Sequence, residues 1–302
     1  MGSTGSGVLV LDGGMGRELM RIGAPFRQPE WSALALLEGP EWVVQAHRNF
    51  IEAGAGLITT NSYAVVPFHL GEERFAARGR ELSDLSGQLA RRAVTESGRD
   101  DVLVAGSLPP LFGSYRPDLF EADRAESVID PLVAGLAPYV DLWLGETLGS
   151  IVEARTVRDA LDRAGSGRPL WLSFTLDDHV PGTLRSGEPV DEAVVAALSL
   201  GAEAVLFNCC QAETISHALA TAGPSCAGRA RTGGYANRFV AAHSSETRAN
   251  EGLAQFRDDL APDEYGAVVA EWLATGATLV GGCCGMEPAH IERIAALVAD
   301  AG

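Results

Sequence analysis

The feature of this sequence that most constrains its fold is a regular alternation of short apolar runs with longer segments of helical periodicity. The runs have the length and composition of buried strands, and the segments between them repeat apolar residues about every 3.6 positions. The predicted strands cover residues 8–11, 57–60, 102–106, 142–145, 170–174, 204–207, 230–234 and 278–281. The predicted helices cover residues 42–53, 82–96, 127–137, 151–164, 192–200, 213–222, 265–275 and 291–299. Eight strands alternating with helices predict an α/β protein, a single (β/α)8 TIM barrel over residues 1–302.

Chain length allows other architectures. A chain of 302 residues is long enough for two domains, but single α/β barrels of about 250 residues are common. The main alternative is an open doubly wound sheet, and the even strand spacing and the lack of a Gly-x-Gly-x-x-Gly opening turn favour the barrel. We expect residues 1–7 to be a flexible polar lead. Because this lead lacks the basic and apolar regions of a signal peptide, we expect a cytoplasmic protein.

Composition excludes several function classes. A net charge of −17 at pH 7 argues against nucleic-acid binding, since there is no surplus of basic groups to neutralise phosphates. The chain contains no lysine, which excludes a Schiff-base mechanism and a Walker A phosphate loop. No apolar run approaches the roughly 20 residues of a membrane span. Five cysteines, an odd number in a long chain, favour a reducing compartment.

The polar and reactive residues gather just after the predicted strands. In a (β/α)8 barrel the active site lies at the carboxyl ends of the strands, so these residues should meet at one rim. They are Asp12, Gly13, Gly14 and Met15 after the first strand, Asn61 after the second, Glu146 after the fourth, Asn208 and Cys209 after the sixth, Tyr235 and Asn237 after the seventh, and Cys283 and Cys284 after the eighth.

The three cysteines of this group, Cys209, Cys283 and Cys284, indicate a metal site. Cys283 and Cys284 are adjacent, and adjacent cysteines rarely form a disulfide with each other because their side chains point apart. Together with Cys209 they would bring three thiolates to one rim and leave a tetrahedral zinc ion with an open position, which is typical of catalytic zinc. The alternative is that they are small buried core residues.

Five motifs resemble, in order, those of the homocysteine S-methyltransferase family. They are Leu11-Asp12-Gly13-Gly14-Met15-Gly16, Thr59-Thr60-Asn61-Ser62-Tyr63, Asp141-Leu-Trp-Leu-Gly-Glu146-Thr147, Asn208-Cys209 and Gly281-Gly282-Cys283-Cys284-Gly285. The resemblance covers nearly the whole chain. It implies a TIM barrel, Zn²⁺ held by Cys209, Cys283 and Cys284, and methyl transfer to the thiol of homocysteine, giving methionine.

The resemblance also implies how homocysteine is held. Glu146 and Asp12 would bind its ammonium group, and backbone N–H groups around Gly13, Gly14 and Met15 could bind its carboxylate, since glycine allows close approach. The structural alternatives are that Asp12 bonds its own turn and that Glu146 is a helix N-terminal acid.

Two asparagines are further members of the expected substrate site. Asn61 and Asn208 would orient loops or ligands, and Tyr235 and Asn237 are weaker candidates for the same role. Methyl transfer from a sulfonium or ammonium donor needs no general base, which agrees with the absence of histidine from the motifs.

The methyl donor is the least determined part of the sequence-based prediction. A single barrel has no room for the folate and cobalamin modules of larger members, so we expect S-methylmethionine or S-adenosylmethionine, with betaine or another thetin as the alternative. Long segments 23–40 and 108–121, with Trp31, Phe112 and Tyr115, would overhang the rim and face the donor. Segment 237–260 is either a lid or a surface insertion. The oligomeric state stays open.

Two other functions compete. The cysteines could form a non-catalytic zinc or thiol redox sensor on a barrel scaffold, although a sensor does not need the polar rim. A metal-independent barrel lyase or hydrolase is the third possibility, and it would be indifferent to chelators.

Overall fold

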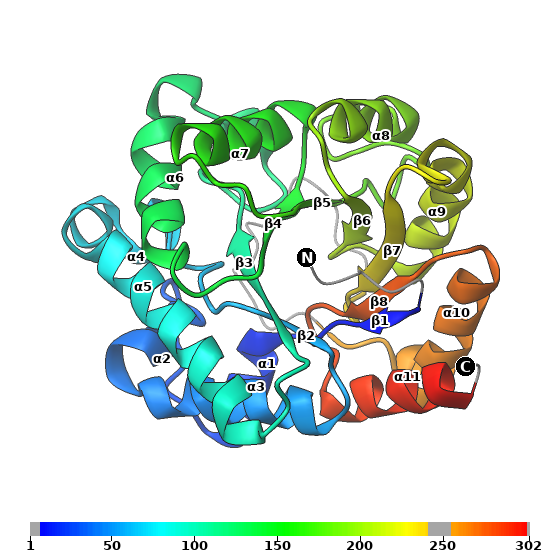
Figure 1. The fold of residues 1–302 in the computed structure, drawn as a ribbon, viewed down its shortest axis with the longest axis horizontal. Coiled ribbons are helices and arrows are strands. Elements are labelled where there is room, and N and C mark those ends of the chain that lie inside the picture. The colour runs from blue at the N-terminus through cyan, green and yellow to red at the C-terminus, as the bar shows by residue number, and fades with distance from the viewer. Residues whose placement is uncertain (1–6, 241–254, 301–302) are drawn as a thin grey trace.

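The structure is a computed structural model that describes residues 7–240 and 255–300. Eight parallel strands form a closed barrel, and the helices surround it as an outer ring (Figure 1). Each strand pairs with its neighbours in chain order, β8 pairs with β1, and a bridge between Leu11 and Leu57 closes the barrel between β1 and β2. The predicted single (β/α)8 TIM barrel is confirmed.

The strands lie where the apolar runs predicted them. Their bounds are β1 Leu9–Val10, β2 Leu57–Thr59, β3 Leu103–Leu108, β4 Leu142–Leu148, β5 Leu170–Phe174, β6 Ala204–Asn208, β7 Arg231–Ala236 and β8 Leu279–Gly282. Several strands extend further at their carboxyl ends than predicted. Glu146 is therefore part of β4 and Asn208 part of β6, because backbone pairing continues after the apolar pattern has given way to polar residues.

The helices cover the outside of the barrel. They are α1 Met15–Ile22, α2 Ala33–Glu38, α3 Pro40–Glu52, α4 Pro67–Leu70, α5 Glu72–Ser97, α6 Ala122–Leu136, α7 Ile151–Arg163, α8 Val190–Ser199, α9 Ala212–Cys226, α10 Pro262–Ala274 and α11 Pro288–Asp300, with 3-10 turns η1 Pro117–Leu119 and η2 Asp258–Leu260. The segment 23–40, expected to be a loop, contains α2. Within the described residues, none of these helices is long and apolar enough to cross a membrane.

Apolar side chains fill the barrel on both sides of its wall. One cluster packs between the strands and the helices. A second fills the interior, and its members are Leu11, Leu57, Ala105, Leu142, Leu144, Trp171, Ala204, Leu206, Tyr235 and Leu279. The interior is therefore a packed core, and only the rim at the carboxyl ends of the strands is left for a site. Most of the segment 237–260, expected to be a lid or an insertion, lies outside the described residues.

One buried histidine makes the stability of the barrel depend on pH. His47 on α3 is fully buried, and neither ring nitrogen has a hydrogen-bond partner. Burial lowers its pKa to about 3, so the folded protein holds the neutral ring. A histidine in the unfolded chain has a pKa of about 6.5. Above pH 6.5 the ring is neutral in both states and His47 does not oppose folding. As the pH falls from 6.5 towards 3, the unfolded chain binds a proton that the folded protein does not, so the free energy of unfolding decreases.

We expect His47→Leu to remove this acid sensitivity. From the two pKa values, His47 lowers the free energy of unfolding by about 2 kcal/mol between pH 7 and pH 5. Urea unfolding of the wild type and the variant at both pH values measures the difference. His217→Leu, which replaces an exposed histidine on α9, is the control and should keep the wild-type pH dependence. Equal pH dependence in His47→Leu and the wild type would contradict the assignment.

Candidate active site and metal centre

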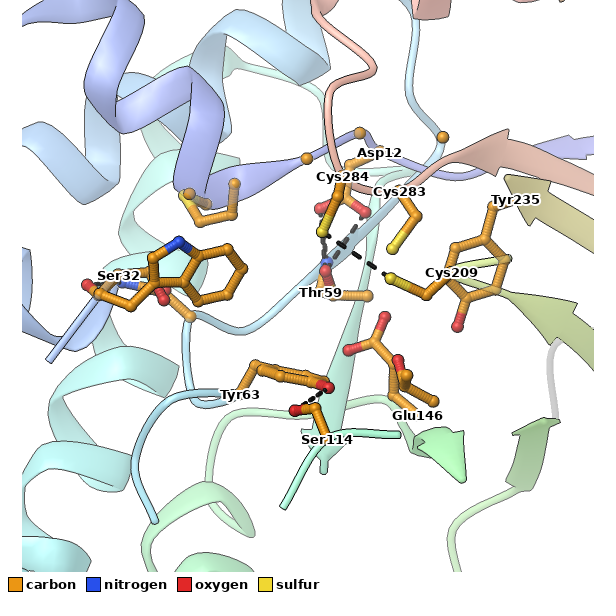
Figure 2. A pocket seen from close by; sticks show the side chains of 18 of the residues that line it. Asp12, Ser32, Thr59, Tyr63, Ser114, Glu146, Cys209, Tyr235, Cys283 and Cys284 are labelled. Atoms are coloured by element: carbon orange, nitrogen blue, oxygen red, sulfur yellow. Dashed lines mark hydrogen bonds between the residues drawn. The ribbon is translucent and has the colours of Figure 1, made fainter. Parts of the chain in front are cut away.

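A cavity opens at the carboxyl ends of the strands, where the sequence placed the reactive residues (Figure 2). The space within it, including the open mouth, is about 730 Å³. Almost all predicted site residues line it, namely Asp12, Gly13, Gly14, Met15, Asn61, Glu146, Cys209, Tyr235, Cys283 and Cys284. Asn208 and Asn237 are the predicted residues that do not.

Three cysteine sulfurs converge on one side of the cavity. Cys209 follows β6, and Cys283 and Cys284 follow β8; their Sγ atoms all lie within 4.8 Å of one another. The Sγ atoms of Cys209 and Cys284 are 3.8 Å apart. Zinc–sulfur bonds of about 2.3 Å in a tetrahedron place two sulfurs about 3.8 Å apart. The spacing therefore fits a shared zinc ion.

The three thiols also influence each other's ionisation. Hydrogen bonding with Cys283 and Cys284 lowers the pKa of Cys209 well below its usual range. The same interactions with Cys209 raise the pKa values of Cys283 and Cys284. A cation among the three sulfurs would favour the ionised form of all three.

Close backbone contacts hold the loop that carries Cys283 and Cys284. The Gly14 N–H donates to the Met286 carbonyl at 2.9 Å. A Cβ atom at Gly14 would lie 2.7 Å from the Cys283 carbonyl oxygen, so the turn after β1 packs directly on the cysteine loop. Gly285 has a φ of +82° and ends this loop against Phe256. Both positions need glycine.

Two carboxylates face the same cavity. Asp12 accepts a hydrogen bond from the Thr59 N–H at 2.8 Å, and Glu146 accepts one from the Ser107 hydroxyl at 2.5 Å. Burial raises the pKa of Asp12 to about 8 and that of Glu146 to about 7. Charge repulsion adds to this effect: Glu146 raises the pKa of Asp12, and Cys209 raises the pKa of Glu146. A bound cation would relieve this repulsion.

The start of α1 offers backbone donors beside these acids. The Gly14 N–H donates to the Met286 carbonyl. It is therefore not available for a substrate carboxylate, contrary to the expectation from the sequence. Met15 and Gly16 occupy the first helical positions and line the cavity. Their N–H groups have no acceptor within the helix, so they suit an anionic ligand group better than the Gly14 N–H does.

The two asparagines hold protein groups in place. The Asn61 amide donates to the Ser32 carbonyl at 3.1 Å and so anchors the segment before α2. The Asn208 amide donates to the Thr147 hydroxyl at 2.8 Å and accepts from the Ser173 hydroxyl at 2.7 Å. Asn208 does not line the cavity, and its partners are protein groups, which include the Cys283 Sγ at 3.8 Å from its amide nitrogen. Asn237 accepts from the Phe239 N–H and is likewise turned away.

Aromatic side chains form part of the cavity wall. Trp31, Tyr63 and Tyr115 line the cavity, and Trp31 meets Tyr63 edge to face at 6.2 Å between ring centroids. Phe112, expected to face the donor, packs against Phe120 instead. Tyr63 had no assigned role in the sequence analysis, although it ends the motif after the second strand.

Backbone strain is concentrated at this site. Among the described residues, the non-glycine residues with positive φ are Trp31, Tyr115, Thr147 and Cys209, and all four line the cavity. Such conformations cost about 1–3 kcal/mol each and persist where the surrounding structure imposes them, commonly at functional sites. Sequence patterns carry no sign of this strain.

The other cysteines lie apart from the cluster. Cys210 and Cys226 are both buried in the core between strands and helices. Burial raises both of their pKa values, so each is an unreactive thiol. As expected for adjacent residues at a strand exit, the two side chains point to different sides: Cys209 lines the cavity, and Cys210 packs in the core between strands and helices.

Relatives of known structure and name share this architecture. Homocysteine S-methyltransferase 4 of Zea mays is 31% identical, with 98% of this chain and 90% of that protein aligned. Homocysteine S-methyltransferase of Escherichia coli (strain K12) is 30% identical, with 96% of this chain and 94% of that protein aligned. Among solved structures, the metallated form of the homocysteine methyltransferase MmuM from Escherichia coli superposes with a TM-score of 0.76 and 28% identity, covering 96% of each chain.

A sequence model of the family described as homocysteine S-methyltransferase matches residues 9–298. This range includes all of the motifs on which the resemblance was based. The chain therefore belongs to the homocysteine S-methyltransferase family.

Proposed function

We propose that this protein transfers a methyl group from a small sulfonium donor to the thiol of homocysteine, with Zn²⁺ held by Cys209, Cys283 and Cys284. The observation that carries the proposal is that three cysteine sulfurs and two buried carboxylates face one cavity. Membership of the family supports the methyltransferase activity. The sulfur-only donor set supports zinc over harder cations such as Mg²⁺ or Ca²⁺.

The cysteines leave room for a substrate sulfur. Three protein ligands satisfy all but one position of a tetrahedral zinc ion, and the cavity lies on the open side of the cluster (Figure 2). Zinc, when bound, would keep an acceptor thiol in its reactive thiolate form at neutral pH. Cys209 is buried and Cys283 and Cys284 are partly buried, which would limit access of water to that sulfur.

The rest of homocysteine is held by charge. Its ammonium group pairs with Asp12 and Glu146. Burial raises the pKa of both carboxyl groups, and a cation beside them would favour their ionised forms. Its carboxylate accepts hydrogen bonds from the N–H groups of Met15 and Gly16 at the start of α1. The Tyr235 hydroxyl, buried on the cavity wall near Glu146, is a further candidate to hydrogen-bond the substrate.

The aromatic wall suits the methyl donor. A sulfonium cation placed against Trp31, Tyr63 and Tyr115 is stabilised by the faces of the rings. The acceptor thiolate attacks the methyl carbon in line. The bond from that carbon to the sulfonium sulfur then breaks, and the donor leaves as a neutral thioether. We favour S-methylmethionine over S-adenosylmethionine because the sequence has no glycine-rich nucleotide turn.

The test of this function is methionine formation from homocysteine with different donors. Zinc-loaded protein is incubated with S-methylmethionine, S-adenosylmethionine, betaine or dimethylsulfoniopropionate, and we expect S-methylmethionine to give the highest kcat/KM. Chelation should abolish activity and added zinc should restore it, whereas a metal-independent lyase or hydrolase would be indifferent.

Variants make this test specific to the metal site. Cys283→Ser should lose zinc and activity together, because a hydroxyl is a much poorer zinc ligand than a thiolate. Cys226→Ser changes a cysteine on α9 outside the cluster and should keep both. A preference for betaine would change the donor only, and methionine formation by metal-free protein would refute the zinc mechanism.

Amino-acid recognition gives a second prediction. Asp12→Asn and Glu146→Gln should each weaken homocysteine binding by about 1–3 kcal/mol, the cost of losing a charge-assisted hydrogen bond. Zinc content should not change. Isothermal titration calorimetry with homocysteine measures the effect.

A matched control is available on α7. Glu153 is also buried, with its pKa raised to about 7 by burial, but it bonds the Gly149 N–H and the Ser150 hydroxyl and does not line the cavity. Glu153→Gln should therefore leave homocysteine affinity as it is. Wild-type affinity in both cavity variants would show that the ammonium site is elsewhere.

A further inference from the structure

We infer that Arg185 is a positioning residue for the metal centre, acting through Tyr115, whose hydroxyl contacts the Cys209 sulfur. This inference rests on the proposed zinc site, and it adds a residue behind the metal ligands that none of the family motifs contains. Arg185 and its partner Asp178 lie between β5 and α8, away from every motif of the sequence analysis.

Tyr115 touches the cysteine cluster directly. Its hydroxyl oxygen lies 2.7 Å from the Cys209 Sγ. A phenol has a pKa of about 10 and is neutral at pH 7, and a thiolate can only accept, so the Tyr115 hydroxyl is the donor when Cys209 is ionised. A donor of this kind withdraws electron density from the sulfur and stabilises its negative charge. Tyr115 also has a φ of +62°, so its backbone is held in a costly conformation that aims the ring at the cluster.

Arg185 lies over the ring of Tyr115. Its guanidinium carbon is 5.1 Å from the ring centroid, within the range of a cation–π contact. Only 10% of the Arg185 side chain is exposed, and its buried Nε has no hydrogen-bond partner. Burying a cation with a donor unsatisfied is costly. The fold therefore holds the Arg185 cation against the Tyr115 ring even though its Nε–H group is left without an acceptor.

Asp178 ties Arg185 to the element that carries Cys209. It accepts from an Arg185 NH2 group at 3.1 Å, and its other oxygen accepts from the Gln211 N–H at 2.8 Å and the Thr214 hydroxyl at 3.0 Å. Gln211 and Thr214 lie at the start of α9, immediately after Cys209 and Cys210. The chain of contacts thus begins and ends at the same β6–α9 turn, which fixes Arg185 relative to Cys209.

The charge of the metal centre explains why such a support is useful. Three thiolates around a divalent cation leave one unit of net negative charge, and an acceptor thiolate adds another. A stronger hydrogen-bond donor to sulfur stabilises this state. The cation of Arg185, which lies over the Tyr115 ring, strengthens the phenol as that donor.

Cobalt substitution provides a spectroscopic test. Co²⁺ replaces zinc in tetrahedral thiolate sites, and its sulfur-to-metal charge-transfer absorption reports on the electron density of the bound sulfurs. The spectra of wild type, Arg185→Met, Arg185→Lys, Tyr115→Phe and the double variant Arg185→Met/Tyr115→Phe are compared at full cobalt loading. Loss of a hydrogen bond to sulfur raises the energy of its electrons and moves the band to lower energy.

We expect Arg185→Met and Tyr115→Phe to shift the band in this same direction, and the double variant to shift no further than Tyr115→Phe alone. Arg185→Lys keeps the cation and should restore most of the wild-type band. Arg163→Met, which breaks an ion pair with Asp130 on the outer helices, is the matched control and should leave the spectrum as it is.

Two results would overturn the inference. An unshifted band in Arg185→Met with a shifted band in Tyr115→Phe would show that Arg185 does not act through Tyr115. Shifts that add in the double variant would show that the two residues act independently. Absence of any charge-transfer band in the wild type is a different result, because it refutes the proposed metal site itself and the inference with it.

Discussion

The site depends on one constraint, which is that Cys209 at the end of β6 and Cys283 and Cys284 after β8 must come within bonding distance of a single ion. The two strands are not neighbours in the barrel, since β7 lies between them. Their sulfurs meet because the cysteine loop folds inward over the rim, and glycine at positions 14 and 285 allows the backbone segments to pack that closely. At the end of β6, Cys209 has a positive φ, so the backbone is also strained at the ligand that faces the cysteine loop.

Electrostatics follows from this convergence. The cluster of thiols lies in the same cavity as Asp12 and Glu146, and burial raises both carboxyl pKa values. A cavity so rich in acidic groups is poorly suited to an anionic substrate and well suited to ligands that carry an ammonium or a sulfonium group. The proposed acceptor and donor are both of that kind, and the cavity offers carboxylates for one cation and aromatic rings for the other.

Most of the fold could be predicted from the sequence, because parallel strands buried on both faces leave continuous apolar runs. The strand ends were misplaced where polar residues such as Glu146 and Asn208 continue the pairing. Helix α5 begins at Glu72, earlier than predicted, because its first turns are dominated by charged residues and show little apolar periodicity.

The candidate site was predictable where residue type alone implies chemistry, as with the cysteines, and where a motif carried the position, as with Asp12. Directions of side chains were not predictable. Phe112 packs against Phe120 and Asn208 bonds Thr147 and Ser173, because tertiary contacts that leave no local sequence pattern decide which way these side chains face. Arg185 and Asp178 could not be found, since a charged pair in an irregular segment has no sequence pattern.

The central claim is that three cysteine sulfurs hold one zinc ion and leave a position for the sulfur of homocysteine. Zinc K-edge X-ray absorption of the zinc-loaded protein tests it most directly. We predict three sulfur neighbours at about 2.3 Å and one lighter atom, changing to four sulfur neighbours when homocysteine is added. Fewer than three sulfurs in the free protein, or a coordination shell that does not change with homocysteine, would contradict the account.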